Sequence, residues 1–502
     1  MSFSSSFVHE FLRRLELGNG FYPTSHASSW NRAFPNLGLH DASERERLVT
    51  TSQPRSFRIG TGASIFIESL LPAILDAENE VILVTCFWAP SKTLAALHDA
   101  LTTLAHGRRQ RIQEALARGD APIPPLRFRI CFSSRSLLQK LFHPQSRHGY
   151  VYPPSAWSKK LGLPDPDVLE AGGIQLQAKS LFFLPFSVMH PKFVIIDRRR
   201  AFVPSCNISW EAWLEASVEL TGDAVRELLS FYSRTWEDPH VTPDTERGEA
   251  TESGEAYLEG PAGSPSSGAH HHATFRFPEP VPTLVLPSAS HRNPRFRPFP
   301  WQKAPQPPGT PLNVAVLQLL EQAERSIYLQ TPNITCQSVL SALLDALARG
   351  VDVTVVTNTG MMLLEQLVTS GTTTSWCVRS LVRQSKRLAK RGGQADPAED
   401  TEVGHRIGRL RVCYFRGRAT DPQHRMEGHR EEPVHSHLKL TVVDGRYVVL
   451  GSGNMDRASW YTSQELGILF VSCDFADSIK PGLDRALEGR LEVVFDSNLG
   501  NQ

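Results

Sequence analysis

The stretch that decides the fold is "HSHLKLTVVDGRYVVLGSGNMD", residues 435–456. It places His437 and Lys439 two positions apart, Asp444 after a short apolar run, and Ser452 and Asn454 after a second apolar run. The apolar runs are rich in β-branched residues, so we expect a buried strand followed by a hairpin return strand. Residues two apart on a strand point to the same face, and His437 and Lys439 should therefore project together.

The same set occurs a second time in "MHPKFVIIDRRRAFVPSCNIS", residues 189–209. Each member of this copy precedes its counterpart in 435–456 by the same number of positions. These members are His190, Lys192, Asp197, Ser205 and Asn207. A glutamate follows each copy in an apolar stretch, at a separation one residue shorter: Glu219 and Glu465. A lone strand histidine is usually a core residue, but two copies with the same trailing Ser-x-Asn are hard to attribute to chance.

The repeat extends upstream of both histidines. "AENEVILVT" (77–85) aligns with "AERSIYLQT" (323–331), and "LAALHDAL" (94–101) aligns with "LSALLDAL" (340–347). Each pair predicts a strand, a loop and an amphipathic helix. The chain is therefore interpreted as two homologous α/β halves.

A change in composition separates these halves. Residues 240–310 are rich in Pro, Gly and Ser, a composition that buries too little apolar surface to offset its ordering entropy. We predict an N-terminal segment (1–57), a first half (58–239), a flexible linker (240–310) and a second half (311–502). The triplet His270–His272 has metal-binding side chains, but a solvated run of linker histidines is the expected outcome.

The whole-chain composition is that of a soluble globular protein. Of its 502 residues 40% are hydrophobic, and its formal net charge of +1 gives no global attraction to nucleic acid. Its 7 cysteines contain no CxxC pair, which favours a reduced, intracellular compartment. We find neither a signal peptide nor an apolar run of about 18 residues, so we expect a cytoplasmic or peripheral membrane protein.

The repeated side chains suit phosphodiester chemistry. Lysine and asparagine donate hydrogen bonds to a phosphate, and histidine near its ordinary pKa can attack phosphorus or transfer a proton. Cleavage needs one nucleophile and one general acid, and the duplication supplies two histidines. The strand-end aspartates, Asp197 and Asp444, have a structural alternative, a turn or an ion pair.

The two copies resemble the HKD motif of the phospholipase D superfamily, over most of the chain outside the linker. "YLQTPNITCQSVLSALLDALARGVDVTVVTNTG" (328–360) is most similar to the second half of bacterial cardiolipin synthases. The resemblance implies that each half is a mixed sheet flanked by helices. It also implies a pseudo-two-fold axis, with one active site between the halves that is complete within one chain. It implies that this site uses neither a metal nor another cofactor.

The resemblance also implies roles for the repeated residues. His190 is the candidate nucleophile, forming a phosphohistidine, and His437 the candidate general acid, although this order can be reversed. The implied catalytic residues of the two motifs are His190, Lys192, Asp197, His437, Lys439 and Asp444. The implied phosphate ligands are Lys192, Asn207, Lys439 and Asn454, assisted by Ser205 and Ser452. Glu219 and Glu465 are implied to orient the histidines.

The superfamily contains lipid hydrolases, phosphatidyltransferases and nucleases, so its fold does not select the substrate. On a helix, residues 375–393 would carry apolar side chains on one face and arginines and lysines on the rest. This suits an interfacial helix on anionic lipid, and equally a surface helix packed on the core. We favour a phospholipase D or cardiolipin synthase-like phosphatidyltransferase acting on phospholipid at a membrane surface. The alternative is a nuclease, supported by basic residues at 108–119 and 295–301. An inactive scaffold is disfavoured because both polar sets are intact.

Overall fold

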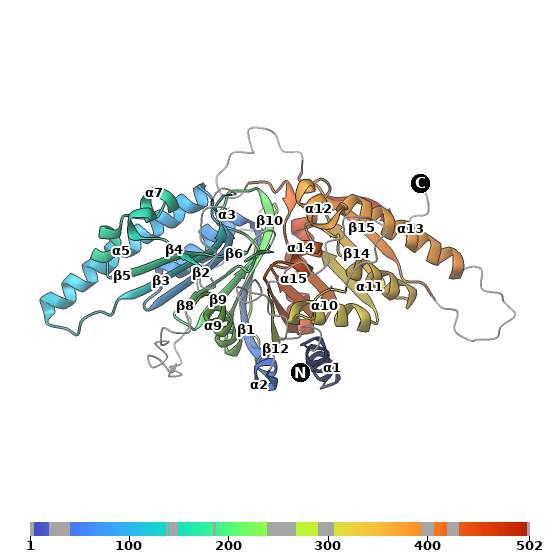
Figure 1. Ribbon diagram of the computed structural model, residues 1–502, viewed down its shortest axis with the longest axis horizontal. Helices are drawn as coiled ribbons and strands as arrows, with labels where there is room; N and C mark the ends of the chain where they lie inside the picture. The colour runs from blue at the N-terminus through green and yellow to red at the C-terminus, as the bar shows by residue number, and fades with distance from the viewer. Residues whose placement is uncertain are drawn as a thin grey trace.

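The structure is a computed structural model that describes residues 5–19, 41–136, 139, 149–183, 187–237, 268–289, 306–392, 406–418 and 431–498. The two halves lie side by side, and their sheets meet in the middle of the molecule (Figure 1). The fold is mixed α/β, a large mixed sheet flanked by helices, as the sequence predicts.

The sheet of the first half changes from parallel to antiparallel at its centre. Its main strands are β2 (Glu80–Phe87), β3 (Leu126–Ser134), β5 (Ile174–Ser180), β8 (Phe193–Ile196), β9 (Arg200–Pro204) and β10 (Trp213–Thr221). β5, β3 and β2 pair in parallel, and β8, β9 and β10 continue antiparallel from β2. The first strand after the histidine, β8, is a fully buried apolar run, as its central position requires. Helices α5 (Lys92–Arg118) and α9 (Asp223–Trp236) flank this sheet.

The second half repeats this order. Its main strands are β13 (Ser326–Gln330), β14 (Asp352–Thr357), β15 (Leu410–Phe415), β17 (Leu440–Val443), β18 (Tyr447–Gly451), β19 (Glu465–Val471) and β20 (Leu491–Asp496). β13, β14 and β15 are parallel, whereas β17, β18 and β19 continue antiparallel from β13. Its main flanking helices are α10 (Pro311–Gln322), α11 (Gln337–Ala348), α13 (Thr374–Gly392) and α15 (Cys473–Leu487). Both halves thus share one strand order, and a two-fold axis between them stays a prediction.

Two strands join the half-sheets; one crosses a predicted boundary and the other lies inside the predicted linker. β1 (Val49–Thr61) pairs with β10 and spans the predicted boundary at 57/58. β12 (Val281–Ser288) pairs with β1 on one side and with β19 on the other. The prediction of a flexible linker is therefore wrong for residues 268–289. The buried apolar residues of β12 offset its ordering entropy, and the Pro/Gly composition of the surrounding segment concealed them.

The histidine triplet is also structured. His270 is buried, with Nδ1 3.2 Å from the hydroxyl of Ser64, while His271 and His272 lie in β11 (His271–Thr274), which pairs with β1. The expectation of a solvated run was therefore wrong. The basic stretch at 295–301 lies outside the described residues.

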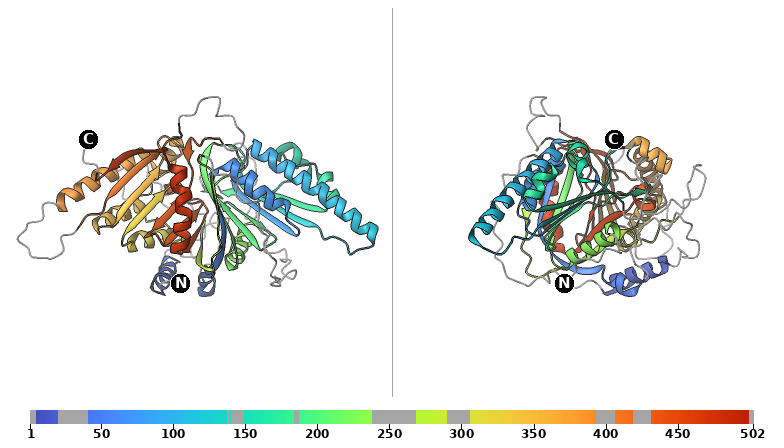
Figure 2. Two further views of the ribbon diagram at one scale, coloured as in Figure 1. Left: turned by 180° about the vertical axis from the view of Figure 1, so that it is seen from behind. Right: turned by 60° about the vertical axis from the view of Figure 1, so that its left-hand side comes forward.

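The core continues across the junction of the halves. Figure 2 shows α15 at the middle of the molecule, and its Phe475, Ile479 and Leu483 pack in one apolar cluster with Leu214 and Val218 of β10. The N-terminal helix α1 (Ser5–Asn19) packs instead on the second half, where Gln318 donates a hydrogen bond to the carbonyl of Phe7 at 2.9 Å. Among the described residues, no helix is long and apolar enough to cross a membrane.

The two motif aspartates are turn residues and do not reach the histidines. Asp197 and Asp444 have φ of 50° and 56°, a left-handed conformation that aspartate tolerates. The Asp444 carboxylate accepts the backbone N–H groups of Glu324, Arg325 and Ser326, at 2.8–3.0 Å. The Asp197 carboxylate likewise accepts three backbone N–H groups at the start of β2, at 2.7–3.0 Å. Four strand residues lie between each aspartate and its lysine, and these five steps along the strand place them roughly 16 Å apart. The catalytic prediction for both aspartates is therefore corrected to a structural role.

Replacing either aspartate should therefore lower stability and spare the chemistry. We expect Asp444→Ala to lower the free energy of unfolding by about 2 kcal/mol, because three N–H groups lose a charged acceptor. Denaturant unfolding measures this, with Asp345→Ala on the exposed face of α11 as the control. A loss of phosphodiesterase activity per folded molecule would contradict the structural assignment.

Candidate active site

The two histidines stand at the junction, each hydrogen bonded through its backbone to the opposite half. His190 lies between β7 (Ser187–Val188) and β8, and its N–H donates to the carbonyl of Gln464 at 3.0 Å. His437 follows β16 (His435–Ser436), and its N–H donates to the carbonyl of Leu214 at 2.8 Å. Main-chain pairing across the junction therefore fixes both histidines.

Each histidine is also held by a glutamate of the other half. His190 Nδ1 lies 2.8 Å from Glu465 Oε2, and His437 Nδ1 lies 2.7 Å from Glu215 Oε1. The glutamate side chains are only 1% and 4% exposed. A buried carboxylate fixes the neighbouring imidazole as the Nδ1–H tautomer, which leaves Nε2 for chemistry.

Glu219 does not have the predicted role. Its carboxylate accepts from Arg200 at 2.9 Å and from Ser56 at 2.9 Å, while Glu215 contacts His437. The constant separation of the repeat fails here because the segment between asparagine and glutamate is three residues longer in the second half. The hairpin register is the signal that finds Glu215. Ser205 N–H donates to the carbonyl of the residue after Glu215, as Ser452 N–H does to the residue after Glu465.

The two serines support the glutamates. Ser205 Oγ donates to Glu215, and Ser452 Oγ donates to Glu465. Their hydroxyl protons are therefore committed to carboxylates, which corrects the prediction that they bind phosphate. Each half contributes a Ser–Glu pair to the histidine of its neighbour.

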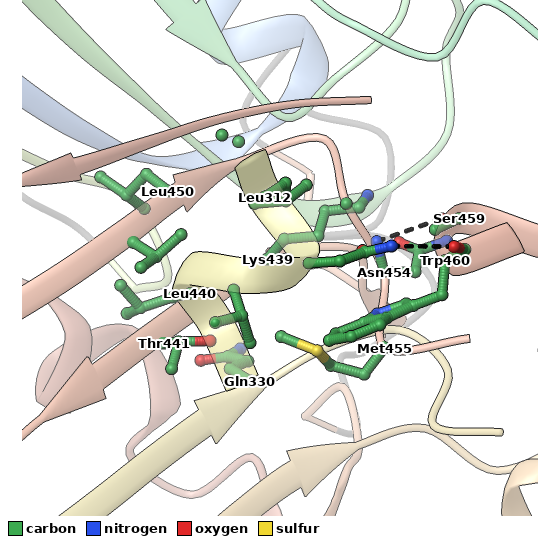
Figure 3. A pocket seen from close by; sticks show the side chains of 16 residues that line it. Leu312, Gln330, Lys439, Leu440, Thr441, Leu450, Asn454, Met455, Ser459 and Trp460 are labelled. Carbon is green, nitrogen blue, oxygen red and sulfur yellow. Dashed lines mark hydrogen bonds between the residues drawn. The ribbon is translucent and has the colours of Figure 1, made fainter. Parts of the chain in front are cut away.

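Both motif lysines fold back on their own histidines. Lys192 Nζ donates to the carbonyl of His190 at 2.9 Å, and Lys439 Nζ donates to that of His437 at 2.7 Å. Lys439 Nζ also lies 2.9 Å from each ring nitrogen of His437. Figure 3 shows Lys439 and Asn454 at a cavity whose other lining residues are largely apolar, among them Leu450. Each lysine therefore brings its charge close to the histidine of its own motif.

The two asparagines differ in their contacts. Asn207 Oδ1 accepts the backbone N–H of Phe87 at 3.2 Å, which aims its amide. Asn454 Nδ2 donates to Asp456 at 3.0 Å, and its Oδ1 is buried without a partner among the described residues. An unpartnered buried amide oxygen is costly, so this position is suited to a donor on a ligand.

Further residues position the histidine loops and were missed by the sequence analysis. The N–H of Met189 donates to Ser133 Oγ at 3.0 Å, and Asn358 makes two hydrogen bonds to the backbone of Ser436, at 2.7 and 2.9 Å. Ser133 is the second-last residue of β3, and Asn358 directly follows β14. Polar residues at the carboxyl ends of parallel strands are a general signal for a site, and that signal was available in the sequence.

Burial determines the charges of the site. It lowers the pKa of His437 to about 4, although Glu215 acts in the opposite direction. Burial likewise lowers the pKa of His190, against the effect of Glu465. The pKa of Lys439 falls to about 7, because burial disfavours its charge. At neutral pH both imidazoles are therefore mainly neutral, and Lys439 holds its proton less firmly than an exposed lysine does.

Among the described residues, no group of three or more His, Cys, Asp or Glu side chains is placed to hold a metal ion.

Comparison with known families agrees with this arrangement. Residues 316–486 match the family model described as "Cardiolipin synthase, PLD-like domain". This part of the chain is similar to the phospholipase D-like domain that the model describes. The matched residues include His437, Lys439 and Glu465, so the second motif lies inside the matched region. No curated protein matches the chain.

Three solved structures are similar to the chain at low identity. A phosphatidylserine synthase of Haemophilus influenzae is 13% identical over 93% of this chain and 92% of its own, with a TM-score of 0.49. The phospholipase D family member Nuc of Salmonella typhimurium is 18% identical over 42% and 96%, with a TM-score of 0.25. A polyphosphate kinase of Porphyromonas gingivalis is 12% identical over 86% and 50%, with a TM-score of 0.40.

Two isosteric substitutions on β10 test whether the contact with His437 matters. Glu215 makes that contact, and its neighbour Glu219 does not. We expect Glu215→Gln to lower phosphodiesterase kcat by about 10²- to 10⁴-fold, because His437 loses its carboxylate partner. Glu219→Gln, four residues along β10, should leave kcat within about twofold. Steady-state kinetics of both variants measures this, and equal losses in the two would show that the contact with His437 is not what matters.

Proposed function

We propose that this protein is a phosphodiesterase of the phospholipase D type. It cleaves or transfers the phosphodiester of a phospholipid through a phosphohistidine. The observation that carries the proposal is the pair of neutral histidines at the junction, each held through Nδ1 by a buried glutamate of the opposite half. Such a pair provides the nucleophile and the general acid that cleavage needs.

His190 is the better nucleophile. Its Nε2 makes no hydrogen bond within the described part of the chain, whereas both ring nitrogens of His437 lie 2.9 Å from Lys439. In the first step Nε2 of His190 bonds to phosphorus, the bond from phosphorus to the leaving alkoxide breaks, and His437 gives that alkoxide a proton. The negative phosphodiester raises the pKa of nearby histidines, which supplies protonated His437 in the complex.

The second step reverses the roles of the groups. His437 takes a proton from water or an alcohol, whose oxygen attacks phosphorus while the bond to His190 breaks. Lys192 and Lys439 are placed to neutralise the phosphoryl oxygens in both steps. Water gives hydrolysis, and an alcohol gives phosphatidyl transfer.

A phospholipid is the substrate class that the family match supports. The description of the matching family model names cardiolipin synthase. The matched residues of this chain, 316–486, include one complete histidine–lysine set. The enzyme would then act at a membrane surface as a peripheral protein. One observation fits nucleic acid instead, the exposed basic side of α13, which suits a phosphate backbone.

An alcohol-transfer assay tests this proposal. The purified protein is given mixed phospholipid vesicles and a short primary alcohol, and mass spectrometry measures phosphatidic acid and phosphatidyl-alcohol. We expect both products, and a loss of about 10³-fold or more in His190→Ala and His437→Ala, because each removes an essential proton or phosphoryl carrier.

The control for folding is the unfolding midpoint of each variant. Failure of the wild type to turn over any phospholipid, while it cleaves single-stranded DNA or RNA, would replace the lipid proposal by the nuclease. A covalent phosphatidyl group trapped on His437, and not on His190, would exchange the roles of nucleophile and general acid and keep the enzyme class.

The lowered pKa of Lys439 predicts how substrate binding depends on pH. The affinity for a soluble phosphodiester should fall above about pH 7, where Lys439 loses its charge and no longer attracts the substrate phosphate. The KM of that substrate, followed against pH, measures this alkaline limb. Lys439→Arg should move the alkaline limb upward, since guanidinium stays charged, and an unmoved limb would assign it to another group.

A further inference from the structure

One short helix of the second half has its polar and apolar sides reversed. In α12 (Leu363–Ser370) the buried residue is Gln366, 3% exposed, while Leu364 is 77% exposed. The other large apolar residues exposed on or beside this helix are Met362, Leu363, Leu367, Val368 and Trp376. A surface helix normally buries its apolar side, so this clustering marks an interaction surface.

Polar contacts hold α12 in place without these apolar side chains. Gln366 Nε2 donates to Asn333 Oδ1 at 2.8 Å, and Gln366 Oε1 accepts from the backbone and hydroxyl of Thr374. The exposed leucines are therefore not needed to dock the helix. Glu365 is the acidic residue among them.

A row of positive charge lies directly beyond this apolar surface. The exposed basic residues of α13 are Arg379, Arg383, Lys386, Arg387, Lys390 and Arg391. The apolar side of α13, with Val378 and Leu381, is buried in the core of the second half, so of the two sequence interpretations the core-packed helix is correct. The charges are thus presented to solvent, and lipid contact through the apolar side of α13 is excluded.

A groove connects the apolar and basic parts. It lies between α13 and the outer strand β20, and its lining combines Trp376, Val382 and Val494 with Arg379 and Arg383. Tryptophan beside arginine on an apolar groove is the composition found at the level of lipid head groups.

This surface lies beside the active site. α12 packs against α14 (Arg457–Tyr461), the helix that follows Asn454, and Figure 1 shows both near the junction of the halves. Asn358, which holds the backbone of Ser436 beside His437, lies at the start of the loop that leads to α12.

We infer that α12 and Trp376 insert into an anionic membrane while the basic row of α13 contacts its head groups. This inference rests on the proposed lipid function and adds the face of the molecule that meets the membrane. Charge complementarity selects anionic lipid over a neutral surface, and the exposed leucines select a membrane over a soluble polyanion. The docked protein presents its junction site to phosphodiesters in the same leaflet.

Vesicle flotation of the full-length protein tests this inference. The probes are vesicles of phosphatidylcholine alone and of equal parts phosphatidylcholine and phosphatidylglycerol. We expect binding to the anionic vesicles, a loss of about tenfold or more in the double variant Leu364→Ser/Leu367→Ser, and a loss of about fivefold in Arg383→Gln. The control is Leu116→Ser, which changes a leucine of α5 whose exposure (68%) lies between those of Leu364 (77%) and Leu367 (46%), and this variant should bind as the wild type does.

Activity on a soluble phosphodiester separates the two proposals. The double variant should keep wild-type turnover of that substrate and lose turnover of vesicles. If the wild type binds anionic vesicles through these residues but turns over no lipid, docking stands and the proposed function fails. Unchanged vesicle binding in the double variant overturns the docking surface. The docking surface is also overturned if the wild type does not bind vesicles and instead self-associates or binds nucleic acid through these residues.

Discussion

The reciprocal contact between histidine and glutamate is the interaction on which the rest of the structure depends. A carboxylate nearly withdrawn from water is tolerated only when charged or polar partners surround it. Glu215 and Glu465 each have two such partners, the serine of their own half and the histidine of the other. Separating the halves would take the histidine from each carboxylate and the glutamate from each imidazole, so the site and the junction form together.

The surrounding architecture keeps this junction closed. β12 pairs with β1 of the first half and β19 of the second, so the segment between the halves forms part of the sheet that joins them. The apolar cluster beneath the site takes residues from both halves, including Leu214 and Leu438. A water-poor setting follows, and it accounts for the lowered pKa of both histidines and of Lys439.

The sequence predicts the parts of this site that depend on local pattern. Alternation on a strand places His437 with Lys439, and exact repetition identifies His190, so the paired sets and the α/β class follow from residues alone. Contacts between strands depend on register, which one hairpin of different length alters. For this reason Glu215 was missed and Glu219 was chosen. Ser205 and Ser452 were assigned to phosphate because their partners lie on another strand.

Other features escaped prediction because composition averages over a segment. The apolar strand β12 is surrounded by residues typical of a linker, and the reversed polarity of α12 shows only once the buried side of Gln366 is known. The aspartates of the motif illustrate the opposite error. Their repetition suggested catalysis, whereas in each half the aspartate accepts N–H groups at the start of the first parallel strand, β2 or β13.

The most direct test of the reciprocal site is the titration of His190 by nitrogen NMR of the imidazole groups in wild type and Glu465→Gln. Resonances are assigned with single histidine variants. Because Glu465 opposes the effect of burial, its neutralisation should lower the pKa of His190 further and leave that of His437 in place. An unchanged His190, or a shift confined to His437, would contradict the assignment of each histidine to a glutamate of the opposite half.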